Sequence, residues 1–202
     1  MAPRLIARHL SHPRGLLGRF VGFLMNRHNA RMNAFAVKML SLQSGDHVLE
    51  IGFGGGATLP ALTAEAKFVA GVDRSADVVS WAKTKYAAAI AAGRAAFHEG
   101  HVEALPFEND SFGKVCTVNT VYFWKSLETG FAEIRRVLAD GGRVVIGFLP
   151  KERMQRLNMP ADIFTLRAPE DVIAALKKCG FSDIRVERPR PDTPWNVVVA
   201  SC

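Results

Sequence analysis

Short apolar runs alternate along this chain with segments whose apolar residues recur every three or four positions. The run at 47–51, HVLEI, is apolar at nearly every position, which is typical of a strand covered on both faces, as in a parallel sheet. Segments with helical spacing follow such runs repeatedly, and capping residues, Pro or Gly bound several of them. This alternation predicts a single α/β domain with an open, doubly wound parallel sheet.

The boundaries of the predicted elements come from this spacing and from the flanking residues. Ser75 and Ser126 precede two helices in positions that suit N-caps, and the segment 139–142 (ADGG) indicates a turn. The segment 150–168 shows no regular pattern. The predicted strands are 47–51, 68–73, 95–99, 114–119, 143–149, 181–187 and 195–201, and the predicted helices are 57–65, 76–92, 127–138 and 169–179.

The N-terminal part of the chain differs from the rest in charge. Residues 15–40 have helical spacing in two apolar stripes, and residues 1–45 contain seven Lys or Arg and no acid, so the whole formal charge of +7 lies there. We interpret 1–45 as a basic amphipathic leader or lid and 46–202 as the main domain. Two roles remain open for the leader, namely a lid over an acceptor pocket or a segment on an anionic membrane surface.

Charge and cysteine usage narrow the setting of the protein. Arg19 interrupts the apolar stretch of the leader, and no stretch approaches the ~18 apolar residues of a spanning helix. Cys116, Cys179 and Cys202 lie far apart, which favours thiols in a reducing cytoplasm over a disulfide framework. We therefore expect a cytoplasmic protein with peripheral membrane contact as an option. Basic charge alone does not indicate a nucleic-acid partner, and none is expected.

The segment 50–56, EIGFGGG, stands at the carboxyl end of the first predicted strand, where ligands bind in such folds. Its glycines let the backbone approach a ligand closely. The loop also matches the dinucleotide fingerprint G-x-G-x-x-A, and Asp73, 21 residues after Gly52, suits the ribose of NAD or of S-adenosylmethionine equally. Glu50 separates the two, because its carboxylate would repel a pyrophosphate but suits a ligand with an amino group and a sulfonium. The balance favours S-adenosylmethionine, with a nicotinamide oxidoreductase as the outside alternative.

Four segments in order, VLEIGFGGG, GVDRS, EALPFENDSFGKV and FAEIRRVLADGGRVVI, resemble the motifs of class I S-adenosylmethionine-dependent methyltransferases. The last two are similar to the type 11 group that includes the ubiquinone- and menaquinone-biosynthesis methyltransferases. The resemblance covers about residues 45–200. It implies a Rossmann-like seven-stranded, mostly parallel sheet whose last strand is antiparallel, with helices on both faces; to this we add an N-terminal helical lid.

The resemblance also implies a cofactor site. Glu50, Gly52 and Gly54 would hold the methionine portion of the cofactor, and Asp73, with Arg74 beside it, would bind both ribose hydroxyls. The remaining predicted cofactor contacts are Phe53, Gly56, His101, Val102, Glu103 and Asn119.

Two positions depart from the family pattern. An acid often follows the glycine before the adenine-facing segment, and here His101 replaces it, so the contact falls to His101 or to the Val102 backbone. A usually structural acid is replaced by Gly113. These two changes support a non-catalytic, cofactor-binding regulatory protein as one alternative.

The segment 119–124 (NTVYFW), after the fourth predicted strand, is the candidate acceptor site. Methyl transfer is an in-line displacement in which the cofactor supplies the reactivity, so the protein mainly aligns the reacting atoms, an effect that can be worth about 7–11 kcal/mol. Three consecutive aromatic residues cannot all point into one core, so one or two are expected to line a pocket. The candidate substrate contacts are Tyr122, Phe123, Trp124 and Asn29, and the candidate catalytic residues are Tyr122, Asn119 and His28.

We therefore predict S-adenosylmethionine-dependent methyl transfer to a small-molecule acceptor by in-line displacement. No metal is expected, because no carboxylates cluster near Asn119. His28 and His101 are candidate bases by their ordinary pKa. A lipid or quinone methyltransferase at the membrane surface is the main alternative. The acceptor atom, the need for a base and the oligomeric state stay open.

Overall fold

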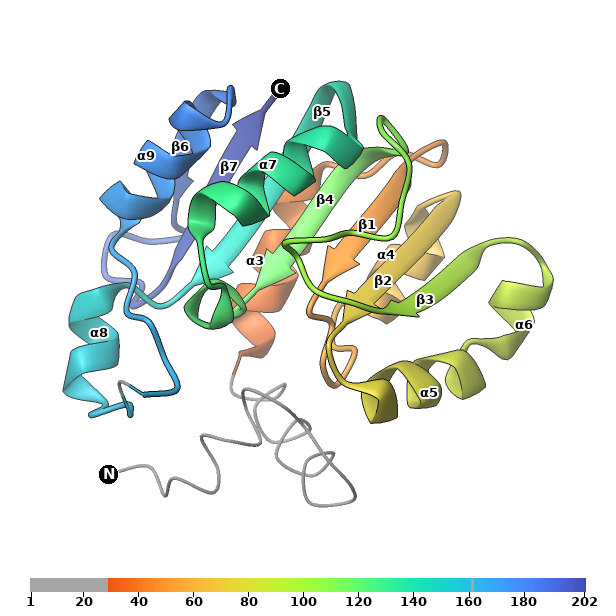
Figure 1. Cartoon of the computed structure of the whole chain (residues 1–202), viewed down its shortest axis with the longest axis horizontal. Coiled ribbons are helices and arrows are strands. Elements are labelled where there is room, and N and C mark those ends of the chain that lie inside the picture. Colours follow the sequence, from red (N-terminus) through yellow and green to blue (C-terminus); the bar gives the residue numbers. More distant parts are fainter. Residues whose placement is uncertain (1–28, 161) are drawn as a thin grey trace.

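A single sheet with helices on both faces forms the framework of the chain (Figure 1). The computed structural model describes residues 29–160 and 162–202. His28 and the first apolar stripe of the leader lie outside these residues, so the predicted N-terminal lid stays a prediction.

Seven strands pair in the order β3-β2-β1-β4-β5-β7-β6. Pairing is parallel from β3 through β5, and β7 is antiparallel to both of its neighbours. The predicted seven-stranded sheet with an antiparallel last strand is confirmed. The strands are β1 (His47–Ile51), β2 (Phe68–Asp73), β3 (Ala95–Glu99), β4 (Phe112–Val118), β5 (Leu138–Phe148), β6 (Ser182–Glu187) and β7 (Asn196–Ser201).

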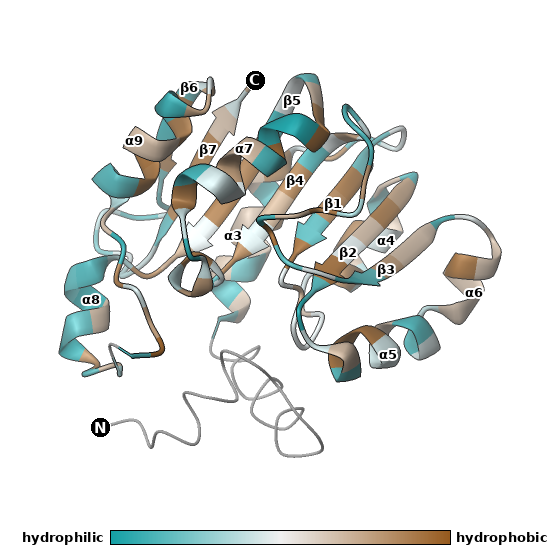
Figure 2. Ribbon diagram, viewed as in Figure 1, coloured by the Kyte–Doolittle hydropathy of each residue, from teal (hydrophilic) through white to brown (hydrophobic). Residues whose placement is uncertain are grey.

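The helices divide between two hydrophobic cores, one on each face of the sheet. The helices α7 and α9 pack on one face, and α3, α4 and α5 pack on the other, so the central strands are brown in Figure 2 while the outer helix surfaces carry teal residues. The helices are α3 (Ala30–Leu40), α4 (Leu59–Glu65), α5 (Ala76–Lys85), α6 (Ala87–Ala91), the 3₁₀ turn η1 (Val121–Phe123), α7 (Leu127–Val137), α8 (Lys151–Arg156) and α9 (Pro169–Lys178).

The local signals that place α5 and α7 are confirmed. The Ser75 hydroxyl accepts a hydrogen bond from the Val78 N–H at 3.4 Å, and the Ser126 hydroxyl accepts one from the Thr129 N–H at 3.1 Å. Each side chain satisfies a donor that the first helical turn leaves unpaired.

Three predicted segments differ from the structure. The predicted helix 76–92 is broken at Tyr86, whose ring packs 5.5 Å from that of Phe97. The predicted turn 139–142 lies within β5, as an irregularity where the register with β4 shifts. The segment 150–168, predicted to be irregular, begins with the short helix α8.

Helix α3 belongs to the layer on the sheet, although its residues fall within the predicted leader. It buries Met32, Ala36 and Leu40 in the core that includes β4, β5 and β7. The Arg143 guanidinium donates to the carbonyls of Met39 and Leu40, at 3.2 and 3.4 Å, where the helix ends. In the described part of the chain, no helix has the length and apolarity that crossing a bilayer would require.

Replacing Leu40 with Ala should lower the free energy of unfolding by about 2–5 kcal/mol, because the fully buried side chain leaves a cavity. Urea denaturation measures the change. Lys38→Ala, on the exposed side of the same helix, is the matched control and should cost less than about 1 kcal/mol. Equal effects of the two substitutions would show that α3 is not part of the core.

Candidate active site

The carboxyl ends of β1, β2 and β4 meet at one edge of the sheet (Figure 1). The chain runs outward from β1 through β2 to β3 and then returns to β4 on the other side of β1, so the strand order reverses there. Ligands of open α/β sheets bind outside such a reversal. The loop after β1 begins at this point, with the Gly52 N–H donating to the Val72 carbonyl at 2.7 Å.

The glycines of this loop serve different purposes. Gly52, Gly54 and Gly56 all have positive φ, of 69°, 47° and 66°. A Cβ at Gly52 would overlap the Thr120 methyl group, and one at Gly56 would lie 2.7 Å from the Trp81 ring. A Cβ at Gly54 would meet nothing within 4 Å. Two glycines thus permit tight packing, and the third leaves open space of the kind that a bound cofactor needs.

Glu50 is a buried carboxyl beneath the loop, only 4% exposed. Its strand neighbours are the small residues Gly71 and Cys116, and its Oε1 accepts a hydrogen bond from the Thr58 hydroxyl. Oε2 has no partner in the described residues. Burial, and to a lesser degree the negative charge of Asp73, raises the pKa of Glu50 from 4.5 to about 7, while the Thr58 hydrogen bond opposes the rise. An incoming cation would favour the carboxylate form.

Asp73 ends β2 and holds the glycine loop. Its carboxylate accepts hydrogen bonds from the Gly54 N–H at 2.9 Å and the Ser75 N–H at 3.0 Å. The Asp73 carbonyl accepts a third bond from the Gly100 N–H at 3.1 Å, which connects β2 to the segment predicted to face adenine. One residue therefore organises two parts of the predicted cofactor site.

Arg74 extends from the end of β2 toward the aromatic turn after β4. Its guanidinium carbon lies 5.9 Å from the centroid of the Phe123 ring, within the range of a cation–π contact. The Arg74 Nε is buried without a hydrogen-bond partner in the described residues. This contact brings a predicted cofactor residue and a predicted substrate residue together.

The three residues of the segment 101–103 differ in exposure and in hydrogen bonding. His101 is exposed, and the Val102 side chain is buried. Glu103 Oε1 accepts a hydrogen bond from the Lys125 N–H at 2.9 Å. The Glu103 carboxylate therefore already has a protein partner, which ties this segment to the turn that follows η1.

Asn119 and Tyr122 are joined where β4 and β5 end. Asn119 has a φ of 59°, and its N–H donates to the Gly147 carbonyl at 2.7 Å. The Tyr122 hydroxyl accepts from the Leu149 N–H at 2.5 Å and lies 3.2 Å from Asn119 Oδ1. Burial raises the pKa of the Tyr122 phenol far above its ordinary value, so the phenol stays protonated at neutral pH.

The three consecutive aromatic residues point to different places. Tyr122 and Trp124 are 4% and 5% exposed and belong to the core, where Trp124 packs 5.3 Å from Phe131. Phe123 is only partly buried, and its ring lies 5.0 Å from that of Phe164. Phe123 is therefore the ring of this turn with surface left for an acceptor.

Several residues at the site carry no sequence signal. Thr58 bonds Glu50 and Trp81 closes on the glycine loop, yet no motif or spacing marks either residue. Thr120, which also closes on the loop, lies in the predicted acceptor segment 119–124. Asn29 directly precedes α3 and makes no side-chain cap, and its carbonyl accepts a hydrogen bond from the Asn33 N–H, so its substrate contact stays a prediction. Among residues 29–160 and 162–202, no group of three or more His, Cys, Asp or Glu could hold a metal ion.

Comparisons with known proteins agree with this geometry. A family model described as a methyltransferase domain matches residues 49–146. The uncharacterised methyltransferase YdaC of Bacillus subtilis is 28% identical over 169 residues, which cover 82% of this chain and 88% of that protein. The ubiquinone/menaquinone biosynthesis C-methyltransferase UbiE of Geotalea daltonii is 32% identical over 133 residues, and the match covers 64% of this chain and 55% of UbiE.

Solved structures show the same fold. Geranyl diphosphate C-methyltransferase from Streptomyces coelicolor A3(2), in complex with Mg²⁺, geranyl diphosphate and S-adenosyl-L-homocysteine, matches with a TM-score of 0.72 at 15% identity, over 94% of this chain and 85% of that one. The domain match, the named relatives and the sheet topology confirm the resemblance found in the sequence motifs. The methyl donor is S-adenosylmethionine, and the chain belongs to the class I S-adenosylmethionine-dependent methyltransferases.

Proposed function

We propose that this enzyme transfers the methyl group of S-adenosylmethionine to a small apolar molecule held beside η1. The observation that carries the proposal is the position of Phe123, a partly accessible ring in η1, after β4, that contacts Arg74 of the proposed donor site. An acceptor packed on this ring would lie next to the cofactor, which the carboxyl ends of β1 and β2 would hold.

The donor site would bind its cofactor through the loop and two acids. Glu50 would face the amino group of the methionine portion, and the backbone of the loop from Gly52 to Gly56 would lie along it. The Phe53 ring packs on Phe97 at 5.4 Å and supports the loop from below. Asp73 would accept hydrogen bonds from the ribose hydroxyls. The bound cofactor supplies an electrophilic methyl group on a sulfonium, so the protein's task is alignment.

The acceptor side would be apolar. Partly buried apolar residues pack against the core around η1, at the end of β5 and in the 157–168 segment: Phe123, Leu149, Met159, Ile163 and Leu166. Tyr122 is buried and protonated, so its role is to position Asn119. The Tyr122 hydroxyl lies at the Asn119 carbonyl oxygen, which leaves the amide NH₂ to donate to an acceptor oxygen or nitrogen. His28 stays a predicted base.

The second candidate is methylation of a quinone or lipid at a membrane surface. The similarity to UbiE over 64% of this chain favours it, as does the apolar character of the proposed acceptor wall.

The change at Gly113, which supported a regulatory protein, has a local explanation. A Cβ at Gly113 would lie 3.7 Å from the Asp46 carboxylate, so an acid there would place two negative charges together.

Replacing Asp73 with Ala should weaken binding of S-adenosylhomocysteine by about 30-fold or more. The substitution removes charge-assisted hydrogen bonds to the ribose, each worth roughly 1.5–3 kcal/mol. Isothermal titration calorimetry measures the dissociation constant. Glu65→Ala, an exposed acid at the end of α4, is the matched control and should change nothing. An unchanged dissociation constant for Asp73→Ala would refute the ribose assignment.

Affinity for S-adenosylhomocysteine should depend on pH through Glu50. Because the pKa of Glu50 is raised to about 7, binding a cationic amino group below that pH requires the carboxyl to lose its proton. Affinity should therefore be about tenfold weaker near pH 6 than near pH 8. Calorimetry in buffers of different ionisation enthalpy detects the released proton. In Glu50→Gln this proton release should disappear, and its persistence would assign it to another group.

The same group has the opposite effect on the cofactor-free fold. Unfolded Glu50 titrates near 4.5 and folded Glu50 near 7, so the folded state keeps a proton that the unfolded state has lost between these values. The stability contribution of Glu50 is present below about pH 4.5 and is lost as the pH rises through about 7. Urea denaturation should accordingly give Glu50→Gln a higher free energy of unfolding than the natural protein near pH 8 and no higher value near pH 4.

Replacing Phe123 with Ala should lower methyl transfer while leaving S-adenosylhomocysteine affinity within about threefold, since the ring is expected to touch the acceptor. Labelled S-adenosylmethionine and a panel of phenols, thiols, amines, carboxylates and a vesicle-embedded quinol provide the assay. Trp124→Ala should instead lower stability by about 3–5 kcal/mol, because it empties a core position.

The panel also separates the competing functions. Turnover with the vesicle-embedded quinol alone would favour the membrane-surface enzyme. Cofactor binding without methylation of any acceptor would favour the regulatory protein. If Phe123→Ala loses cofactor binding and transfer together, Phe123 does not serve the acceptor specifically.

A further inference from the structure

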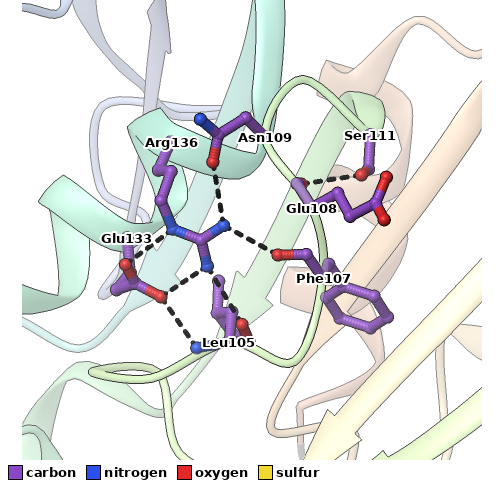
Figure 3. A network of polar contacts seen from close by, with 7 residues as sticks. All are labelled: Leu105, Phe107, Glu108, Asn109, Ser111, Glu133 and Arg136. Atoms are coloured by element: carbon purple, nitrogen blue, oxygen red, sulfur yellow. Dashed lines mark hydrogen bonds and ion pairs between the residues drawn. The ribbon is translucent and has the colours of Figure 1, made fainter.

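Two adjacent arginines on α7 have different partners. Arg135 donates to Asp140 at 3.2 Å and to the Leu138 carbonyl at 3.5 Å, near the end of its own helix. Arg136 turns the other way and bonds the segment 105–109, about 30 residues earlier in the chain (Figure 3).

The Arg136 guanidinium is held by Glu133 and in turn holds the backbone. Nε and Nη2 donate to the two Glu133 carboxylate oxygens at 2.8 and 2.7 Å, a bidentate ion pair. Nη1 donates to the Phe107 carbonyl at 2.7 Å and to the Asn109 side chain at 3.2 Å, and Nη2 donates to the Leu105 carbonyl at 3.0 Å. The hydrogen bonds from Arg136 hold the pKa of Glu133 below its ordinary value, so the pair stays charged.

Glu133 completes the arrangement at Leu105. Its Oε2 accepts a hydrogen bond from the Leu105 N–H at 2.9 Å, so one ion pair binds both the N–H and the carbonyl of that residue (Figure 3). Arginine suits this role because its planar fork can bond several acceptors at once, which a lysine ammonium does not reproduce. The backbone at 105 is thereby fixed to α7.

The segment fixed in this way continues directly from the predicted adenine contacts. On the other side of these contacts, the Gly100 N–H bonds the Asp73 carbonyl at 3.1 Å. The Val102 side chain lies against α7, where a Cβ at Gly130 would be 3.4 Å from it. The turn 101–104 is therefore held at both ends, at Gly100 by Asp73, the proposed ribose-binding acid, and at Leu105 by the Glu133–Arg136 pair.

Within this turn, the Val102 N–H is a backbone donor that a base can meet. His101 is exposed, and the Glu103 carboxylate accepts from the Lys125 N–H. In the described residues, the Val102 N–H donates to no backbone carbonyl. An adenine ring at this position presents N1 as an acceptor for such a donor, whereas hypoxanthine carries a hydrogen on N1.

We propose that Glu133 and Arg136 are positioning residues for adenine recognition, which fix the 101–105 backbone so that the Val102 N–H donates to N1 of the cofactor's adenine. The inference rests on the proposed function, because it requires the adenine to lie against 101–103. A pair that served only to stabilise the fold would weaken all cofactor analogues alike, whereas a positioning pair controls the preference for adenine.

The test compares S-adenosylhomocysteine with its deaminated analogue, S-inosylhomocysteine, by calorimetry. The full-length protein should prefer the adenine compound. In Arg136→Gln the affinity for S-adenosylhomocysteine should fall about tenfold, the affinity for S-inosylhomocysteine should stay nearly constant, and the preference should shrink accordingly. Arg135→Gln is the matched control on the same helix and should keep the full preference.

Glu133→Gln provides a second variant that keeps an oxygen for the Leu105 N–H and loses the charge opposite Arg136. It should show a smaller loss of the same preference, and thermal unfolding verifies that each variant is folded. Equal weakening of both compounds, or an unchanged preference in both variants, would overturn the inference while leaving the methyl-donor assignment intact. A natural protein that bound neither compound would overturn the proposed function and this inference together.

Discussion

The burial of Glu50 is the constraint around which the donor side is arranged. A carboxylate away from water is costly unless charge or hydrogen bonds compensate it, and Glu50 has one hydroxyl partner and one oxygen without any in the described residues. Small residues on both neighbouring strands leave room for the side chain, and the loop above it closes only because its glycines permit contact with Thr120 and Trp81. The Glu50 oxygen without a partner, Oε2, suits a hydrogen bond from the cationic amino group of the proposed ligand.

Hydrogen bonds connect the glycine loop, the segment 100–103 and the aromatic turn. Asp73 is bonded to the glycine loop and, through its carbonyl, to Gly100. Glu103 is bonded to Lys125, just past the aromatic turn. On the far side of that turn, Arg167 donates to the Trp124 carbonyl at 2.9 Å. The proposed donor and acceptor regions are thus held by the same chain of contacts, which is how a protein that relies on alignment would limit the freedom of both reactants.

Sequence patterns predicted β1, β2 and β3 with the bounds that the structure shows. For β1 and β2, whose buried positions are nearly continuous, the signal is an apolar run, as expected of strands covered on both faces. The N-caps of α5 and α7 could also be predicted from the sequence, since a capping side chain bonds a residue only three positions away. The break at Tyr86 could not, because its ring packs on a strand that follows it in the chain. Local spacing contains no information about such contacts.

The sequence by itself determined the donor chemistry, because the loop after β1 and the acid after β2 are short contiguous patterns whose meeting follows from parallel strand ends. Only the tertiary structure decided which of three consecutive aromatic rings keeps an accessible surface and which of two adjacent arginines holds the 105–109 segment. The partners that decide these choices, Phe131 and Phe164 for the rings and Leu105 and Phe107 for Arg136, come from other elements. Side-chain direction is set by packing between elements, and a linear pattern does not encode it.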